Sequence, residues 1–341
     1  MIDLTVVIPT YNRRALLRDA VASLRRQTFD PNRYELLIIS DGATDGTDDD
    51  YAAPLSGPDT RLVRQEKKGF GLARARNLGT KLARGKLVLF FDDDMVAEPG
   101  LVAAHVAAHE RYPEDTVAVC GRVKLAPDLP QTPFCRIVLG DICRLFADNP
   151  DEPRWLDFAM ALSWQTSYKK AQLERVNGFD ENFRSYGWED IEFSYRVTKQ
   201  GMRFWLEPGA VSLHRDQRYT VETHGQRMQN SARMAPLLFQ RHPALAQRIP
   251  LYADKGPIVW GADSPALIVK KWLRALMASR PVNGLLHAAT PLVERLAPSH
   301  ALLSRWYYAL LANYSYLGYR QGLAEFAANN RAPVVDAPRQ A

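Results

Sequence analysis

The sequence has few cysteines and no long apolar run. Its 341 residues include three cysteines, and none of them has the CxxC spacing of a zinc ligand pair. This excludes a disulfide framework or a cysteine cage as the basis of the fold. No apolar stretch approaches the roughly 18 residues that a membrane-spanning helix needs. The residues after Met1 lack the basic and then apolar layout of a signal peptide. We therefore expect a cytoplasmic globular protein.

Net charge is small but unevenly placed. The formal charge is +6, and from Trp260 onward nine Lys and Arg residues stand against four acids, which leaves +5 in that region. We expect no nucleic-acid partner. Residues 266–280 separate on a helical wheel into an apolar face and a basic face that holds Lys270, Lys271 and Arg274. Two interpretations stay open: peripheral contact with the inner face of a membrane, or packing on the rest of the chain or on another subunit.

The first 111 residues alternate apolar strands with amphipathic helices. Strands are predicted at 4–8, 35–40, 61–64 and 86–91, and helices at 14–26, 70–83 and 99–111. This order predicts an α/β fold with a mostly parallel central sheet between helices. Two more helices, 170–176 and 189–200, and two short strands, 204–206 and 210–213, follow. We expect a sheet domain over 1–220, a helical extension over 221–330 and a disordered tail over 331–341.

Three consecutive aspartates follow the strongest predicted strand. Asp92, Asp93 and Asp94 come directly after the apolar run that ends at Phe91. Two unit charges about 4 Å apart repel by about 4 kcal/mol at an effective dielectric of 20, and a divalent cation removes that cost. In an extended segment Asp92 and Asp94 point the same way, which favours them as Mg²⁺ or Mn²⁺ ligands. A solvated acidic turn is the alternative.

Other polar groups follow strand ends or begin helices. Asp41 ends the second strand, where it can accept a hydrogen bond from a base N–H, although an Asp-Gly turn is also an ordinary turn. Arg76 lies on a helix that begins at a glycine-rich segment, a suitable place for an anion. Glu189 and Asp190 begin a later helix, where a carboxylate can act as a base or merely cap the helix. His214 is a candidate metal ligand or a structural histidine.

Taken in order, the motifs resemble glycosyltransferase family 2 with its GT-A nucleotide-diphospho-sugar transferase fold. The last two of these motifs, Gly178–Glu181 and Gly187–Asp190, also resemble an acceptor-side motif of galactosyltransferases. The matching segments are Val6–Arg13, Ile38–Gly42, Ala75–Gly79, Phe91–Asp94, Gly178–Glu181 and Gly187–Asp190. The resemblance covers roughly residues 3–215.

The resemblance implies roles on the donor side. It implies that a divalent cation, Mn²⁺ or Mg²⁺, is held by Asp92, Asp94 and His214. The acidic middle position of the triplet leaves Asp93 and Asp94 open as the alternative pair, and otherwise Asp93 meets a ribose or sugar hydroxyl. The remaining donor-side residues are expected to hold the base, the ribose and the diphosphate of a nucleotide-sugar, with UDP favoured and GDP and dTDP open; they are Pro9, Tyr11, Asp41 and Arg76.

On the acceptor side the resemblance implies an inverting displacement. Asp190 is expected to take the proton of an acceptor hydroxyl, with Trp188 and Glu189 binding the acceptor. The acceptor is expected to be a glycan, a lipid-linked glycan or a small molecule, in cell-envelope or polysaccharide biosynthesis. Two other functions are the alternatives. A nucleotidyltransferase normally has a glycine-rich basic loop after its first strand, which Pro9–Asn12 is not; a non-catalytic sugar- or nucleotide-binding module would not need the full set of carboxylates.

Overall fold

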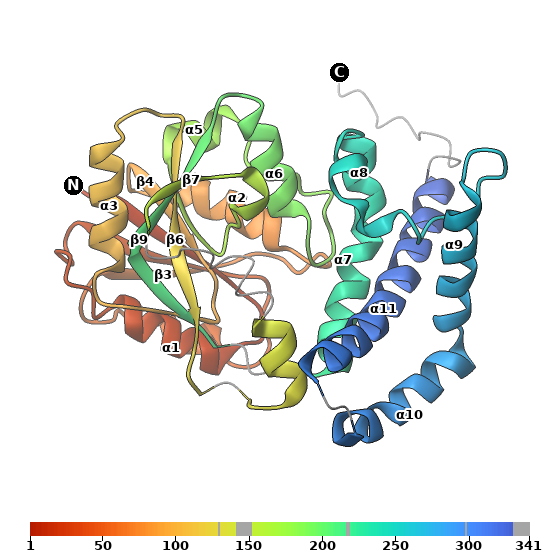
Figure 1. Cartoon of the computed structure of the whole chain (residues 1–341). Helices are drawn as coiled ribbons and strands as arrows, with labels where there is room; N and C mark the ends of the chain where they lie inside the picture. The colour runs from red at the N-terminus through yellow and green to blue at the C-terminus, as the bar shows by residue number, and fades with distance from the viewer. Residues whose placement is uncertain (129, 141–151, 216–218, 297–298, 330–341) are drawn as a thin grey trace. The chain divides into compact units, whose positions relative to one another are not determined.

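The computed structural model describes residues 1–128, 130–140, 152–215, 219–296 and 299–329 (Figure 1). Contacts divide the chain into two compact units. The first unit comprises Met1–Arg184 and Glu189–Gln217, and the second comprises Ser185–Trp188 and Arg218–Ala341. The tail predicted to be disordered, 331–341, lies outside the described residues. No helix in the described ranges has the length and apolarity needed to cross a membrane.

The first unit is built on a mixed sheet, which has nine strands among the described residues. Along the sheet they run β3-β2-β1-β4-β8-β6-β9-β5, with β7 paired to β9. Their bounds are β1 Leu4–Thr10, β2 Tyr34–Ser40, β3 Asp59–Arg64, β4 Leu87–Phe91, β5 Met95–Ala97, β6 Val117–Leu125, β7 Arg154–Leu156, β8 Gln165–Lys169 and β9 Arg203–His214. The four strands predicted first, β1 to β4, pair in parallel as expected.

The other half of the sheet differs from the prediction. β8 runs antiparallel between β4 and β6, and β5 and β7 pair antiparallel with β9. The strands predicted separately at 204–206 and 210–213 are one strand, β9, with a register shift against β6 near Gly121. In sequence, the Glu207-Pro208-Gly209 segment resembles a turn between two strands. In the structure the register shift accommodates these residues within one strand.

Helices cover both faces of this sheet, because buried strands alternate their side chains between two apolar layers. The helices of the first unit are α1 Arg14–Leu24, α2 Leu72–Leu82, α3 Leu101–Arg111, α5 Lys170–Arg175 and α6 Glu189–Thr198, with short turns η1 Asp48–Tyr51, η2 Cys135–Leu139 and η3 Phe158–Met160. On one face, Leu89 and Phe91 of β4 join an apolar cluster with α1 and α3. On the other, Phe90 packs with Phe179, 5.3 Å between ring centroids, and Phe179 stacks on Phe193 of α6.

The second unit is helical, as predicted for the C-terminal region. Its helices are α7 Val221–Arg241, α8 Leu245–Arg248, α9 Pro265–Met277, α10 Arg280–Leu296 and α11 His300–Asn329, with the short turn η4 Pro250–Tyr252. α11 packs along α7, and α9 and α10 lie against α11 (Figure 1). The α7–α11 approach depends on Gly318 and Gly322, since a Cβ at either would collide with a carbonyl oxygen of α7.

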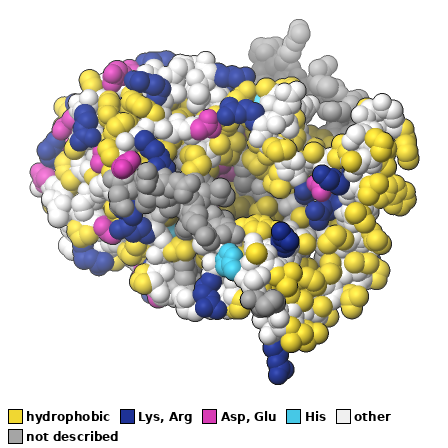
Figure 2. Space-filling view, in the orientation of Figure 1, with side chains coloured by type: hydrophobic (Ala, Val, Ile, Leu, Met, Phe, Trp, Pro, Cys, Tyr) yellow, Lys and Arg dark blue, Asp and Glu magenta, His cyan; other side chains and the backbone are white. Residues whose placement is uncertain are grey.

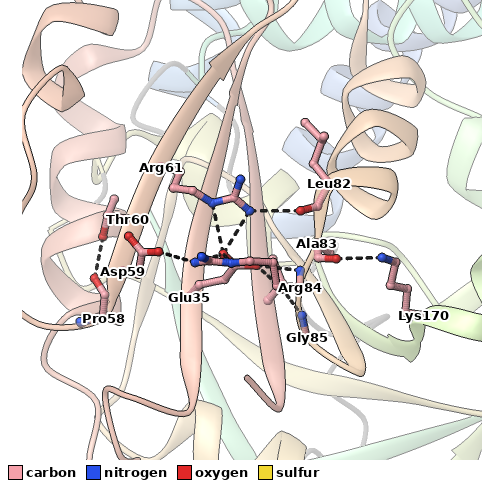
Figure 3. A network of polar contacts seen from close by, with 11 residues as sticks. Glu35, Pro58, Asp59, Thr60, Arg61, Leu82, Ala83, Arg84, Gly85 and Lys170 are labelled. Carbon is pink, nitrogen blue, oxygen red and sulfur yellow. Dashed lines mark hydrogen bonds and ion pairs between the residues drawn. The ribbon is translucent and has the colours of Figure 1, made fainter. Parts of the chain in front are cut away.

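A buried carboxylate ties together the amino-terminal ends of several strands (Figure 3). Glu35 in β2 is fully buried and accepts hydrogen bonds from Thr5 Oγ1 at 2.7 Å, Arg84 N at 2.8 Å and Arg84 Nε at 2.7 Å. Arg61 of β3 adds an ion pair at 3.0 Å. Burial alone would raise the pKa of Glu35, but the hydrogen bonds from Arg84 and Thr5 and the charge of Arg61 together lower it. The network lies at the edge of the sheet opposite the aspartate triplet.

We expect Glu35→Ala to destabilise the protein by about 3–5 kcal/mol, because two arginines, the Arg84 amide and the buried Thr5 hydroxyl lose their acceptor. The measurement is the free energy of unfolding in urea. Glu98→Ala is the matched control: its pair with Lys124, at 3.4 Å, is exposed and is expected to contribute less than about 1 kcal/mol. Equal losses in the two variants would contradict a structural role for the Glu35 network.

Candidate active site

The carboxyl ends of β1, β2 and β4 meet at one edge of the sheet, because these neighbouring strands run parallel. Thr10 ends β1, Asp41 follows β2 and Asp92 follows β4. Ligands of open α/β sheets bind beyond such ends. Strand pairing therefore brings together three positions that lie 31 to 82 residues apart in sequence. The sequence predicted Asp41 and Asp92 at strand ends, and the structure confirms these positions.

The aspartate triplet is a turn and not an extended segment. Met95 N donates to Asp92 O at 3.2 Å, so the chain reverses over residues 92–95 before β5 begins. The extended backbone assumed for the triplet is therefore wrong, and strand alternation does not apply to it. Asp94 Oδ2 lies 3.6 Å from His214 Nε2, and Asp92 Oδ1 lies 3.3 Å from Arg76 Nη2. Burial raises the pKa of Asp92 to about 6, and the negative charge of Asp94 adds to this effect.

Arg13 is a site residue that the sequence analysis missed. Its Nη1 donates to Asp93 Oδ1 at 2.9 Å and to Asp94 Oδ2 at 2.7 Å. Thr10 Oγ1 donates to the other Asp93 oxygen at 2.7 Å. Both oxygens of Asp93 therefore already have partners within this chain, and a ribose hydroxyl would have to join or displace them. Arg13 was detectable in principle, because it follows the end of β1 as Asp92 follows the end of β4.

A second arginine connects the triplet to helix α6. Arg76 of α2 is 2% exposed; its Nη2 lies 3.3 Å from Asp92 Oδ1, and its Nη1 lies 3.0 Å from Glu189 Oε1. The guanidinium is also 5.3 Å from the Phe179 ring. The part that Arg76 plays at the donor diphosphate stays a prediction. Arg76 holds together two carboxylates that are 97 residues apart in sequence.

The two carboxylates at the start of α6, Glu189 and Asp190, have raised pKa values, so they accept protons more readily than ordinary carboxylates do. Burial raises the pKa of Glu189 to about 7, helped by the charge of Asp190 and opposed by Arg76. Burial also raises the pKa of Asp190, although Arg76 and the Ile191 amide at 2.8 Å act against it. Burial outweighs both opposing effects, so the pKa of Asp190 lies above its usual range. A basic carboxylate therefore lies one residue from the Arg76 ion pair.

The nucleotide side of the predicted site is centred on Asp41, which is buried. Its carboxylate accepts from Gln65 Nε2 at 2.7 Å, Lys67 Nζ at 2.6 Å and Gly71 N at 3.1 Å. A side chain at position 71 would collide with this carboxylate, so glycine is required there. A base N–H would have to join or replace these donors. The part that Asp41 plays in base binding stays a prediction.

Lys67 also links Asp41 to Tyr11, since its Nζ lies 3.4 Å from the centre of the Tyr11 ring. The ring is partly exposed, whereas Pro9 is buried within β1. Gln65 and Lys67 follow β3 and were missed in the sequence, although the rule that selected Asp41 would also have selected them. Tyr11 thus presents an aromatic face near the end of β1, while Pro9 shapes the strand beneath it.

His214 ends β9 and faces the triplet through the pairing of Met95 with His214. His214 Nε2 lies 3.6 Å from Asp94 Oδ2. Carboxylate oxygen and imidazole nitrogen are a suitable donor set for Mn²⁺ or Mg²⁺-type ions. Across the described residues, however, no three acidic, histidine or cysteine side chains already converge as a cage. The Asp94–His214 pair fits a cation, and Asp92 as a further ligand stays a prediction.

Trp188 belongs to the second unit, although Glu189 next to it belongs to the first. Its backbone is in the left-handed region, with φ of 75°, an unusual conformation for a bulky residue. The indole Nε1 donates to Ser231 O at 2.9 Å, and the ring packs against Tyr252. These contacts hold the strained residue in place. Whether Trp188 binds an acceptor stays a prediction.

Comparison with known proteins identifies the class. Residues 5–134 match the family model described as glycosyl transferase family 2, and residues 164–224 match the one described as the N-terminal domain of galactosyltransferase. The solved structure of Staphylococcus aureus TarS 1–349 in complex with UDP is similar in fold, with a TM-score of 0.52 and 16% identity over 99% of this chain and 94% of that one. The fold is therefore the GT-A fold. Within it, residues 5–134 are similar to glycosyltransferase family 2, as the motifs predicted.

Curated relatives agree with this assignment. Validoxylamine A glucosyltransferase of Streptomyces hygroscopicus subsp. limoneus is 29% identical over 290 residues, which cover 79% of this chain and 63% of that protein. Chondroitin synthase of Escherichia coli is 27% identical over 242 residues, 62% of this chain and 34% of the relative. The chain thus spans less than two-thirds of the length of either relative.

Proposed function

We propose that this glycosyltransferase moves a sugar from a nucleoside diphosphate donor to an acceptor hydroxyl, with inversion at the anomeric carbon. The observation that carries the proposal is that Arg76 forms ion pairs with both Asp92 and Glu189. Asp190, whose pKa is raised, directly follows Glu189, so a basic carboxylate is connected to the aspartate triplet through Arg76. A base and an anion-handling site in one unit are the two parts that a single displacement needs.

The donor is proposed to be a UDP-sugar. TarS, which shares the fold, has been solved with UDP and with UDP-GlcNAc. Asp41 is proposed to recognise the base and Tyr11 to stack near it, with Pro9 supporting them. Asp93 is proposed to meet a sugar or ribose hydroxyl by exchanging its bond with Arg13. These assignments follow the family resemblance and the positions of the side chains at strand ends.

A divalent cation is proposed to be bound by Asp94 and His214, with Asp92 as the further ligand. When bound, Mn²⁺ or Mg²⁺ neutralises the charge that develops on the leaving diphosphate. Arg13 is the counter-cation of Asp94, at 2.7 Å. A cation held by Asp94 would compete with Arg13 for that carboxylate, and the Arg13 guanidinium would then be available to the diphosphate.

At the acceptor end, Asp190 is proposed to take the proton. As the acceptor oxygen forms its bond to the anomeric carbon, the bond from that carbon to the diphosphate oxygen breaks and the hydroxyl proton passes to a carboxylate oxygen of Asp190. Glu189 is proposed to bind the acceptor, because its buried Oε2 has no hydrogen-bond partner in the described part of the chain. A sugar hydroxyl would supply the missing donor.

The acceptor is proposed to be a glycan, a lipid-linked glycan or a small molecule. The relatives named above comprise an enzyme that glucosylates validoxylamine A and a polysaccharide synthase, and a further relative is an O-antigen biosynthesis protein of Myxococcus xanthus at 29% identity. Polysaccharide or cell-envelope synthesis therefore suits the chain as well as small-molecule glucosylation does. Peripheral membrane contact is also proposed, and the surface for it is derived below.

Donor and cation binding are tested by thermal denaturation with UDP-sugars, with and without Mn²⁺. A ligand at about 100 times its Kd stabilises the folded state by about 2.7 kcal/mol, so a clear rise in Tm is expected with UDP and a further rise with Mn²⁺. Asp94→Asn should remove the Mn²⁺-dependent increment and retain the UDP response. An Mn²⁺ increment that is unchanged in Asp94→Asn would show that the cation binds elsewhere, and no response to any nucleotide-sugar would overturn the donor proposal.

A further inference from the structure

Helix α9 is amphipathic, but its apolar side faces the solvent and part of its basic side is buried. Its apolar residues spaced at 3 or 4 positions face outward, including Val269, Trp272, Leu273 and Leu276; Trp272 is 64% exposed. Lys271, in contrast, is 8% exposed. In globular proteins the apolar stripe of a helix normally faces the core. The basic face predicted for this helix is therefore turned inward in part, and the solvent meets the apolar face.

Ion pairs and hydrogen bonds hold α9 in this orientation. Lys271 Nζ donates to Asp263 Oδ2 at 2.6 Å and to Pro257 O at 2.8 Å. Arg274 lies 3.2 Å from Asp254 Oδ2 and 3.3 Å from Asn313 Oδ1 of α11. Buried ion pairs of this kind are costly to break. The helix cannot rotate to hide its apolar stripe without losing them.

Helix α10 continues the exposed apolar surface. Its solvent-facing positions repeat at helical spacing, and they are Arg280, Pro281, Gly284, Leu285, Ala288, Pro291, Leu292, Arg295 and Leu296. Leu285 is 70% exposed. Trp260, ahead of α9, is 76% exposed. Figure 2 shows apolar side chains gathered over this part of the second unit. We call the exposed apolar residues of 259–296 the outer face; such contiguous surfaces mark binding sites.

The charges that accompany the outer face are of one sign. From 259 to 296, the exposed charged residues are Lys270, Arg280 and Arg295. The two acids of the same segment are turned away: Asp263 pairs with Lys271, and Glu294 accepts a hydrogen bond from Tyr307 at 2.5 Å. Exposed leucines and tryptophans with cations, and without exposed acids, are typical of helices that lie in the interface of an anionic membrane.

We propose that the outer face of α9 and α10 docks on an anionic lipid bilayer, with Trp272 and the leucines inserted among the acyl chains and with Lys270, Arg280 and Arg295 at the phosphate groups. A second copy of the chain is a poorer occupant, because a symmetric contact would bring the same three cations together without an opposing acid. In this arrangement the apolar side of α9 is the side turned to the bilayer, while Lys271 and Arg274 brace the helix from within.

The test is co-sedimentation of the full chain with vesicles of phosphatidylcholine alone and with vesicles that also contain phosphatidylglycerol. We expect sedimentation with the anionic vesicles and little with the neutral ones. Trp272→Ser combined with Leu276→Ser should weaken partitioning on the order of tenfold or more, since exposed apolar groups are lost. Reversal of Lys270, Arg280 and Arg295 to glutamate should weaken it by about fivefold or more for each cation.

Matched controls keep the result specific to this face. Leu251→Ser removes an apolar residue that is 43% exposed in η4, and it should leave partitioning unchanged. Reversal of the exposed Arg26, Lys81 and Lys199 of the first unit to glutamate changes net charge equally and should have a much smaller effect. Equal binding by the serine variant and the full chain would overturn the proposal, as would no binding to either vesicle.

The competing occupant has its own signature. If analytical ultracentrifugation shows a dimer that Trp272→Ser with Leu276→Ser dissociates, and vesicles are not bound, the face is an interface between copies and the proposal is wrong. Vesicle binding is read without donor or turnover. Its failure therefore leaves the proposed reaction untouched, and failure of the reaction would leave vesicle binding intact.

Discussion

Asp190→Asn is expected to lower kcat by about 10²–10⁴-fold while leaving UDP binding intact, because an amide cannot accept the acceptor proton. The isosteric change retains the shape of the side chain and removes its basicity. Turnover is measured as UDP release in the presence of donor and acceptor, and donor binding is measured by thermal shift. The effect should appear in kcat, since the lost interaction acts on the reacting hydroxyl.

Asp180→Asn is the matched control for this variant. Asp180 lies in the neighbouring motif, and its carboxylate accepts hydrogen bonds from Asn182 N at 2.9 Å and Asn182 Nδ2 at 2.6 Å within its own turn. We expect a change of no more than about twofold, as for substitutions of turn residues away from the chemistry. Asp190→Asn with near-normal turnover would overturn the assignment of the base and direct attention to Glu189.

Arg76→Met is expected to destabilise the folded protein by about 3–5 kcal/mol. The substitution leaves the carboxylates of Asp92 and Glu189 without the cation that they share, and the Glu189 side chain is almost fully buried. Urea unfolding provides the measurement. The double variant, with Glu189→Leu added to Arg76→Met, should recover much of the loss, because it also removes the carboxylate that Arg76→Met leaves uncompensated. A loss below about 1 kcal/mol would show that the pairs contribute little.

The same variant has a consequence for pH dependence that a purely structural role would not produce. Burial raises the pKa of Asp190, and the charge of Arg76 lowers it in part. Since the base acts deprotonated, activity falls as the pH drops through that pKa. Loss of Arg76 should raise the pKa further, so the acid limb of the kcat profile should move to higher pH in Arg76→Met. An unmoved limb in a folded Arg76→Met would contradict electrostatic coupling between the two residues.

Periodicity predicted the parallel half of the sheet because its strands are short apolar runs that alternate with amphipathic helices. β8 and β6 were missed. β8, with the sequence Gln165–Lys169, is largely polar in type, yet it is buried. Ser167 Oγ forms hydrogen bonds with His105 Nδ1 at 2.8 Å and with His109 Nε2 at 2.9 Å. A polar strand of this kind is stabilised by partners distant in sequence, so its local composition does not identify it.

In the site, the strand-end rule selected Asp41 and the aspartate triplet, and it would also have selected Arg13 and Lys67 had it been applied to cations. The extended backbone assumed for the triplet was wrong, because the chain turns there. The part expected for Arg76 at the diphosphate stays a prediction. Packing of α2 against the start of α6 buries Arg76 between two carboxylates, which helical spacing alone did not predict.

Helical spacing by itself predicted a helix with an apolar and a basic face over 266–280, and the structure has α9 there over Pro265–Met277. In the same way, apolar runs by themselves predicted the strands whose ends hold Asp41 and Asp92. Only the tertiary structure decided which face of that helix meets solvent, and which carboxylate Arg13 or Arg76 neutralises. The reason is physical: periodicity is a property of neighbouring residues, whereas ion pairs such as Lys271 with Asp263, or Arg76 with Glu189, depend on which elements pack together.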